Sequence, residues 1–234
     1  MAMPFRSASE LTEAQRTLVA RLLESHGRHE LASAHVLAAA VPLAPSLDDK
    51  ILLIEHAREE LDHFESAAVL YEELDAGDLL SKVAPGAARV PRAESWLEVA
   101  FVQFLFCRAG KLQLREYAGS TYRPYAEIVA KILREEEEHG AAGEATLREL
   151  CREPPHAEKA QACFERWLRI SLLSFASWTA AGRQGATLGL RARESGAVIR
   201  DYLADIAPAI SACALRLPSR RELGIDLPQD IPLG

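Results

Sequence analysis

The sequence predicts an all-α protein, a four-helix bundle with two additional C-terminal helices, and three observations lead to that prediction. Runs of alternating β-branched and aromatic residues, which are typical of strands, do not occur in the 234 residues. Alanine, leucine, glutamate and arginine instead recur at the helical period. Prolines and glycines divide this pattern into segments of helical length. We expect helices at about residues 9–41, 46–76, 93–117, 123–151, 157–180 and 191–214.

The first two helices are predicted from their boundary residues. Ser9 begins the first helix, and Pro42 ends it because proline lacks a backbone donor and clashes with the preceding turn. Ser46 or Asp48 can cap the second helix, which we expect to end by Gly77. A short connection of this kind makes the two helices antiparallel neighbours.

The second pair of helices follows a longer connection. Residues 77–91 contain two prolines and a further glycine, so we expect a crossover loop there. The third helix ends near Gly119, and Pro124 is accepted in the first turn of the fourth, which stops before Pro154. Two antiparallel hairpins then pack into one bundle, and residues 1–234 form a single domain.

Composition and charge narrow the class of protein. Hydrophobic residues make up 49% of the chain, and the net charge of −7 argues against a nucleic-acid or anionic-membrane partner. The N-terminus lacks the apolar stretch of a signal peptide, and no run of about 18 apolar residues occurs. We therefore expect a cytoplasmic protein. Four cysteines without CxxC spacing suggest neither a zinc site nor a disulfide framework, namely Cys107, Cys151, Cys163 and Cys213.

One short pattern, Glu-Glu-x-x-His, appears on both the second and the fourth predicted helix. Residues three apart share a helix face, so Glu60 lies beside His63 and Glu136 beside His139. Glu30 occupies the matching position on the first helix. All lie on stripes that are otherwise apolar, where a buried carboxylate costs several kcal/mol unless a counter-charge compensates. Two metal ions in the bundle core would compensate.

A single Glu-x-x-His is common on solvated helix faces, but two copies and a third glutamate match the carboxylate-bridged dimetal pattern. Glu30 and Glu60 lie 15 residues on either side of Pro45, which places them at one level of the hairpin. Reflecting Glu136 through the second connection predicts a fourth ligand at residue 106 or 107. That position holds Cys107, which can be an apolar filler or a thiolate ligand.

Other residues near Cys107 are candidates for the missing ligand or for the lining of a substrate pocket. Glu98 and Glu116 are each nine residues from Cys107 and face the opposite side of a regular helix. Gln103, one turn before Cys107, can offer a neutral oxygen, and Phe106 can line a substrate pocket. Two histidines lie one turn from the predicted ligands and either support or line the site, or only pack there, namely His26 and His56.

Several segments resemble one known family. Residues 120–126 and 131–139, together with 188–191, 201–208 and 215–218, resemble the phenylacetic acid catabolic family, in particular the catalytic subunit of phenylacetyl-CoA epoxidase. The resemblance covers about residues 25–218 and implies a ferritin-like fold that holds two irons. It assigns Glu30, Glu60 and His63 to one metal and Glu136 and His139 to the other, with Glu60 and Glu136 as bridges.

The resemblance also exposes a difference. The family has an acid where Cys107 stands, so the second metal loses an anionic ligand and a mononuclear or mixed-metal site is conceivable. The implied function is a non-haem di-iron oxygenase that activates dioxygen to oxidise an aromatic or acyl substrate, carried as a CoA or carrier thioester. An external reductase delivers electrons, and we expect a homo- or hetero-oligomer.

Three alternatives stay open at this point. A non-catalytic structural subunit of such an oxygenase can lose a ligand, as the cysteine at position 107 suggests. A ferritin-like iron oxidase would share the ligands, but the helices after residue 156 exceed a minimal storage bundle. A tRNA-modifying di-iron hydroxylase is disfavoured because the chain shows no basic patch.

Overall fold

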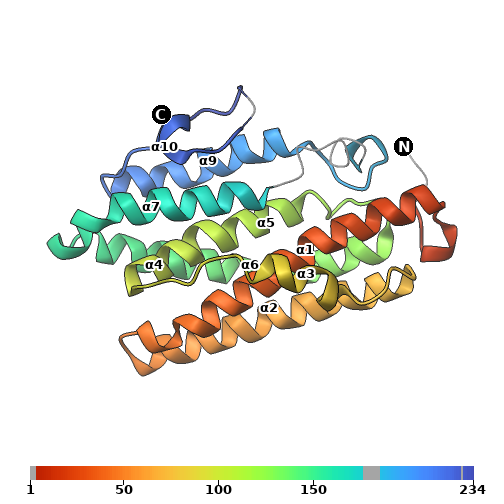
Figure 1. The fold of residues 1–234 in the computed structure, drawn as a ribbon, viewed down its shortest axis with the longest axis horizontal. Helices are drawn as coiled ribbons and strands as arrows, with labels where there is room; N and C mark the ends of the chain where they lie inside the picture. Colours follow the sequence, from red (N-terminus) through yellow and green to blue (C-terminus); the bar gives the residue numbers. More distant parts are fainter. Residues whose placement is uncertain (1–3, 176–184, 228) are drawn as a thin grey trace.

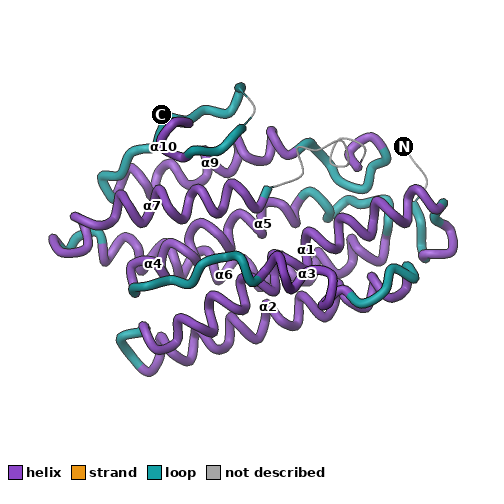
Figure 2. Tube along the Cα trace, in the orientation of Figure 1, coloured by secondary structure: helices purple, strands orange, loops and turns teal. Residues whose placement is uncertain are grey.

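The computed structural model describes residues 4–175, 185–227 and 229–234. Helices dominate these residues, and they contain no strand (Figure 2). The all-α, ferritin-like bundle expected from the sequence is confirmed. Figure 1 shows three layers of helices, with α1 and α2 on one side, α4, α5 and α6 in the middle, and α7 and α9 on the other side.

The first layer is a long antiparallel hairpin. α1 (Glu13–Ala40) is capped at Thr12, three residues later than the predicted start at Ser9, because Thr12 and Gln15 form a reciprocal capping box. α2 (Leu47–Glu73) begins at Ser46, whose side chain accepts a hydrogen bond from the Asp49 backbone. Buried leucines and alanines join the two helices along their length and enclose a few polar residues at mid-height.

The expected crossover loop at 77–91 contains a helix, which corrects the prediction. α3 (Leu79–Ala87) is capped by Asp78, which accepts hydrogen bonds from the backbone of Leu80 and Ser81. Its buried residues are Leu79, Val83 and Ala87, spaced by four. Pro85 and Gly86 suggested a loop, but packing of this apolar face on α1 stabilises the helix despite them.

The third bundle helix is not regular. The segment expected as one helix over 93–117 consists of α4 (Trp96–Phe101), a π-helical segment (Val102–Cys107) and α5 (Arg108–Arg115). π-helical turns are rare and are frequently found at functional sites. α6 (Arg123–Leu150) packs against all three pieces.

The last layer covers the outer face of the third bundle helix. α7 (Pro154–Ser174) begins earlier than the expected residue 157 because prolines are accepted in a first turn, and residues 176–180 of that prediction lie outside the described residues. α9 (Ser195–Ala212) replaces the expected 191–214 and precedes a short α10 (Arg220–Leu223).

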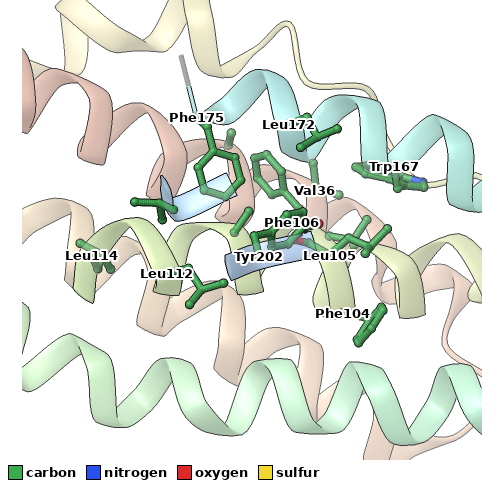
Figure 3. Close-up of a cluster of buried hydrophobic side chains, with 14 of the residues drawn as sticks. Val36, Phe104, Leu105, Phe106, Leu112, Leu114, Trp167, Leu172, Phe175 and Tyr202 are labelled. Atoms are coloured by element: carbon green, nitrogen blue, oxygen red, sulfur yellow. Dashed lines mark hydrogen bonds between the residues drawn. The ribbon is translucent and has the colours of Figure 1, made fainter. Parts of the chain in front are cut away.

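A tight apolar core fixes this last layer to the π-helical segment. Figure 3 shows Phe106, Trp167, Leu172, Phe175 and Tyr202 in this core. The Tyr202 hydroxyl donates a hydrogen bond to the Leu105 carbonyl at 3.2 Å. Among the described residues, no helix combines the length and the apolar character that crossing a membrane requires.

Candidate metal centre

Three helices bring the predicted acids and histidines into one buried cluster. α1 contributes Glu30, α2 contributes Glu60 and His63, and α6 contributes Glu136 and His139. Each of the five is at most 3% exposed. One ligand atom from each of Glu30, Glu60, His63 and Glu136 lies within 4.8 Å of the others.

The two histidines point the same ring nitrogen at the centre of the cluster. His63 Nδ1 lies 3.5 Å from Glu30 Oε2 and 3.5 Å from Glu136 Oε1. His139 Nδ1 lies 3.5 Å from Glu60 Oε1 and 3.8 Å from Glu136 Oε1. The cluster therefore offers two imidazole nitrogens and three carboxylates to a common space.

The outer ring nitrogens are held by residues that the sequence analysis missed. His63 Nε2 donates to Glu135 on α6 at 2.7 Å, and His139 Nε2 donates to Glu59 on α2 at 2.8 Å. The first glutamate of each Glu-Glu-x-x-His therefore orients the histidine of the other copy. The doubled glutamate was the available signal, because a ligating histidine usually has a carboxylate or carbonyl partner for its other nitrogen.

The electrostatics of the cluster indicate a missing positive charge. Burial, together with Glu136 and Glu30, raises the pKa of Glu60 well above its usual range. Burial would also raise the pKa of Glu30, but the neighbouring His26 and His63 side chains hold it well below its usual range. Burial opposes protonation of His63, yet the Glu136 and Glu30 carboxylates, each 3.5 Å from its Nδ1, raise its pKa to about 11. Protons on these side chains compensate the buried negative charge, which a metal cation could also do.

Unsatisfied polar atoms point the same way. Four buried atoms at the centre have no hydrogen-bond partner, which are Glu30 Oε2, Glu60 Oε2, His63 Nδ1 and His139 Nδ1. Buried polar atoms are almost always paired, so four orphans in one place require an explanation. Carboxylate and imidazole donors without a thiolate are the set that iron and similar divalent ions accept. The residues present fit a metal centre of one or two ions.

The third bundle helix supplies Cys107 at the level that the reflection argument predicted. Its Sγ lies 3.8 Å from Glu60 Oε1, and burial, with Glu136 and Glu30, raises the pKa of the thiol well above its usual range. The protonated thiol is a weak donor to Glu60. The two nearby acids face away from the cluster, as their spacing predicted. Glu98 pairs with Arg166 at 2.7 Å, and Glu116 pairs with Arg193 at 2.7 Å.

The remaining predicted residues surround the cluster. His26 Nε2 lies 2.9 Å from Glu30 Oε1, and its other nitrogen is 3.2 Å from the Tyr125 hydroxyl. The His56 ring packs on the His139 ring with centroids 3.9 Å apart and the two planes tilted by 32°. The Gln103 side-chain amide donates to His56 Nδ1 at 3.1 Å. This contact uses the amide nitrogen and not the oxygen that was predicted as a ligand.

The model of the family described as phenylacetic acid catabolic protein matches residues 3–226, nearly the whole chain. A search of the curated proteins finds no significant match. The matched range includes every member of the acid and histidine cluster.

Proposed function

Because this chain belongs to the phenylacetic acid catabolic protein family, we propose that it is a non-haem oxygenase that activates dioxygen at a carboxylate–histidine iron centre. The observation that carries the proposal is the convergence of four orphaned buried atoms in a cluster of five acids and histidines. The family contributes components of a multisubunit oxygenase of phenylacetate catabolism. The substrate is then an aromatic or acyl group, carried as a CoA or carrier thioester.

The proposed ligands divide between two ions. Glu30, Glu60 and His63 would hold one ion, and Glu136 and His139 would hold the other, as the family resemblance implies; the structure brings Glu136 within reach of the first three. When bound, iron supplies the electrons and open coordination positions that dioxygen reduction requires. The third bundle helix adds only a protonated thiol, so a second ion would have fewer anionic ligands, and a single-ion or mixed-metal centre is the alternative.

The surrounding residues hold these ligands in place. Glu59 and Glu135 fix the tautomer and the ring orientation of the two histidines from opposite helices. Tyr125 hydrogen-bonds His26 Nδ1, and the other nitrogen of that ring lies 2.9 Å from a Glu30 oxygen. Electrons come from a separate reductase, and we propose a homo- or hetero-oligomeric assembly.

Metal content and spectroscopy test the proposal. Protein loaded anaerobically with ferrous iron should retain one or two ions per chain and change its ultraviolet–visible spectrum when oxygen is added. Glu60→Ala and Glu136→Ala should each lose retention, whereas Glu55→Ala, an exposed glutamate on α2, should not. Well under one ion per chain in the wild type, with wild-type behaviour of both cluster variants, would refute the proposal.

One observation favours a second candidate, a non-catalytic subunit of such an oxygenase. Cys107 stands where the family resemblance expects an acid, and loss of a ligand is tolerated in a subunit that performs no chemistry. The same experiment separates the two functions. Iron that binds but leaves the spectrum unchanged with oxygen supports the structural subunit, and oxidation of many iron equivalents per chain supports a ferritin-like iron oxidase.

A further inference from the structure

A pocket of about 440 Å³ lies beside the metal-ligand cluster, between α1, α3, α7 and the π-helical segment. We propose that this pocket binds an organic anion with an apolar body, and that Arg28 and Arg89 contact its anionic group. The proposal does not depend on iron or on the proposed oxygenase function, since binding can be measured on the protein as purified.

The inner surface of the pocket is apolar and partly flat. Phe106 is buried, and its ring stacks on His29 with centroids 4.2 Å apart and an interplanar angle of 24°. The aliphatic residues around this ring pair are Ala32, Val90, Ile170 and Leu173. Such a surface accepts a ring or a hydrocarbon chain, and ligand pockets typically combine an apolar lining with a few polar groups.

The charge of the pocket is opposite to that of the chain. The net charge is −7, yet the described lining residues include four arginines and no acid. The arginines are Arg28, Arg89, Arg166 and Arg169. A concave surface that concentrates one sign of charge attracts ligands of the other sign.

Two of these arginines are already engaged by the protein. Arg166 pairs with Glu98 at 2.7 Å and Glu94 at 3.2 Å. The Arg169 Nε donates to the Leu223 carbonyl at 3.0 Å. Arg28 and Arg89, in contrast, make no ion pair with any residue in the described part of the chain. Their guanidinium groups are therefore available for a ligand, and a guanidinium fits a carboxylate or a phosphate equally well.

The lack of a side chain at Gly86 leaves room for Arg28 at the rim of the pocket. A Cβ built on Gly86 would lie 2.8 Å from both Cδ and Nε of Arg28, so the arginine side chain crosses the bare backbone of α3. Any larger residue would displace it. Because Gly86 lies inside α3, where alanine is otherwise the better helix former, this contact gives the glycine a reason to be there.

The pocket lies close to the cluster of acids and histidines along the chain. His29 and Phe106 precede Glu30 and Cys107 in the chain, so consecutive residues build the pocket wall and the cluster. A second, small cavity of about 20 Å³ is lined by both His29 and Glu30. A ligand whose charge lies at the arginines would place its apolar body against the His29–Phe106 ring pair, whose chain neighbours are Glu30 and Cys107.

Calorimetric titration of the purified full chain with three matched probes tests the proposal. The probes are 2-naphthoate, 2-naphthyl phosphate and neutral 2-naphthol. We expect at least one of the two anions to bind about tenfold or more tightly than the alcohol. Each charge-assisted pair contributes about that factor. A tighter phosphate identifies a phosphorylated ligand, and a tighter carboxylate identifies a free acid.

Three variants locate the binding site. Arg28→Gln and Arg89→Gln should each weaken the preferred anion by about tenfold, whereas Arg21→Gln, an exposed arginine on the same helix α1, should leave it unchanged. Gly86→Ala keeps every charge but displaces Arg28, so it should also weaken the anion without lowering the melting temperature. Equal affinity for all three probes, or anion binding that Arg28→Gln and Arg89→Gln leave intact, would overturn the proposal.

Discussion

Gly143→Ala tests how closely α6 must approach the π-helical segment. A Cβ at Gly143 would lie 2.5 Å from the Phe104 backbone nitrogen, 2.6 Å from Gln103 Cβ and 2.8 Å from the Gln103 carbonyl carbon. Two of these atoms belong to the main chain, so no side-chain rotation relieves the clash. The two helices must separate by about 1 Å to restore ordinary contact, and because main-chain atoms cannot rotate away, the overpacking costs about 2–3 kcal/mol, the upper part of the usual range.

The opposing contribution is the helix preference of alanine. Alanine is favoured over glycine by about 1 kcal/mol inside a helix, so the net destabilisation of Gly143→Ala is about 1–2 kcal/mol. For a chain of this length, that corresponds to a fall in melting temperature of about 2–8 °C. Thermal unfolding followed by circular dichroism at 222 nm measures it.

A neighbouring glycine on α6 provides the matched control. A Cβ at Gly140 would meet only Arg108 Nε at 3.7 Å and Nη2 at 4.0 Å, which is ordinary contact. Gly140→Ala should therefore raise the melting temperature slightly, while Gly143→Ala lowers it. If both alanine variants raise the melting temperature, close packing of α6 on the π-helical segment is not what Gly143 provides.

Three further predictions concern the cluster. Glu59→Ala removes the partner of His139 Nε2 and should weaken iron binding by about 10–100-fold with little loss of helicity, measured by competition with a chelator; wild-type affinity would contradict the orienting role. Cys107→Asp adds a carboxylate beside Glu60, so it should raise iron retention. It should also widen the gap between the melting temperatures of metal-loaded and metal-free protein. A narrower gap would show that position 107 does not face the ion. Metal-free protein holds protons on His63, with a pKa of about 11, and on Glu60, whose pKa is raised. Iron must displace them, so affinity should increase with pH, and titration in weak buffer should release at least one proton per chain.

The hairpin geometry could be predicted from sequence because it depends on local signals. Counting outward from Pro45 places Glu30 and Glu60 at one level, and the structure brings their carboxylates into one cluster with Glu136. The same count places Cys107 beside this level, and its sulfur lies 3.8 Å from Glu60. Antiparallel helices share one rise per residue, so distance from the turn fixes height in the bundle.

Contacts that cross between helices could not be predicted in the same way. Glu59 and Glu135 lie one residue from predicted ligands, but only the relative rotation of α2 and α6 decides that each reaches the other helix's histidine. α3 was missed because Pro85 outweighed a short apolar repeat that gains its stability from packing on α1. The π-helical segment leaves no local signature, since its extra residue is accommodated by packing against α6 and α7.

Consecutive residues of the chain contribute to the pocket and to the cluster of acids and histidines. His29 and Phe106 stack at the pocket, while their chain neighbours Glu30 and Cys107 belong to the cluster. The close approach at Gly143 holds α6, which carries two proposed ligands, against the same π-helical segment. Arg28 and Arg89 at the pocket rim are not members of the cluster, so a change there should alter which organic anion binds without moving the proposed metal ligands. A change at Gly143 instead disturbs both sites, since it separates the two elements that define them.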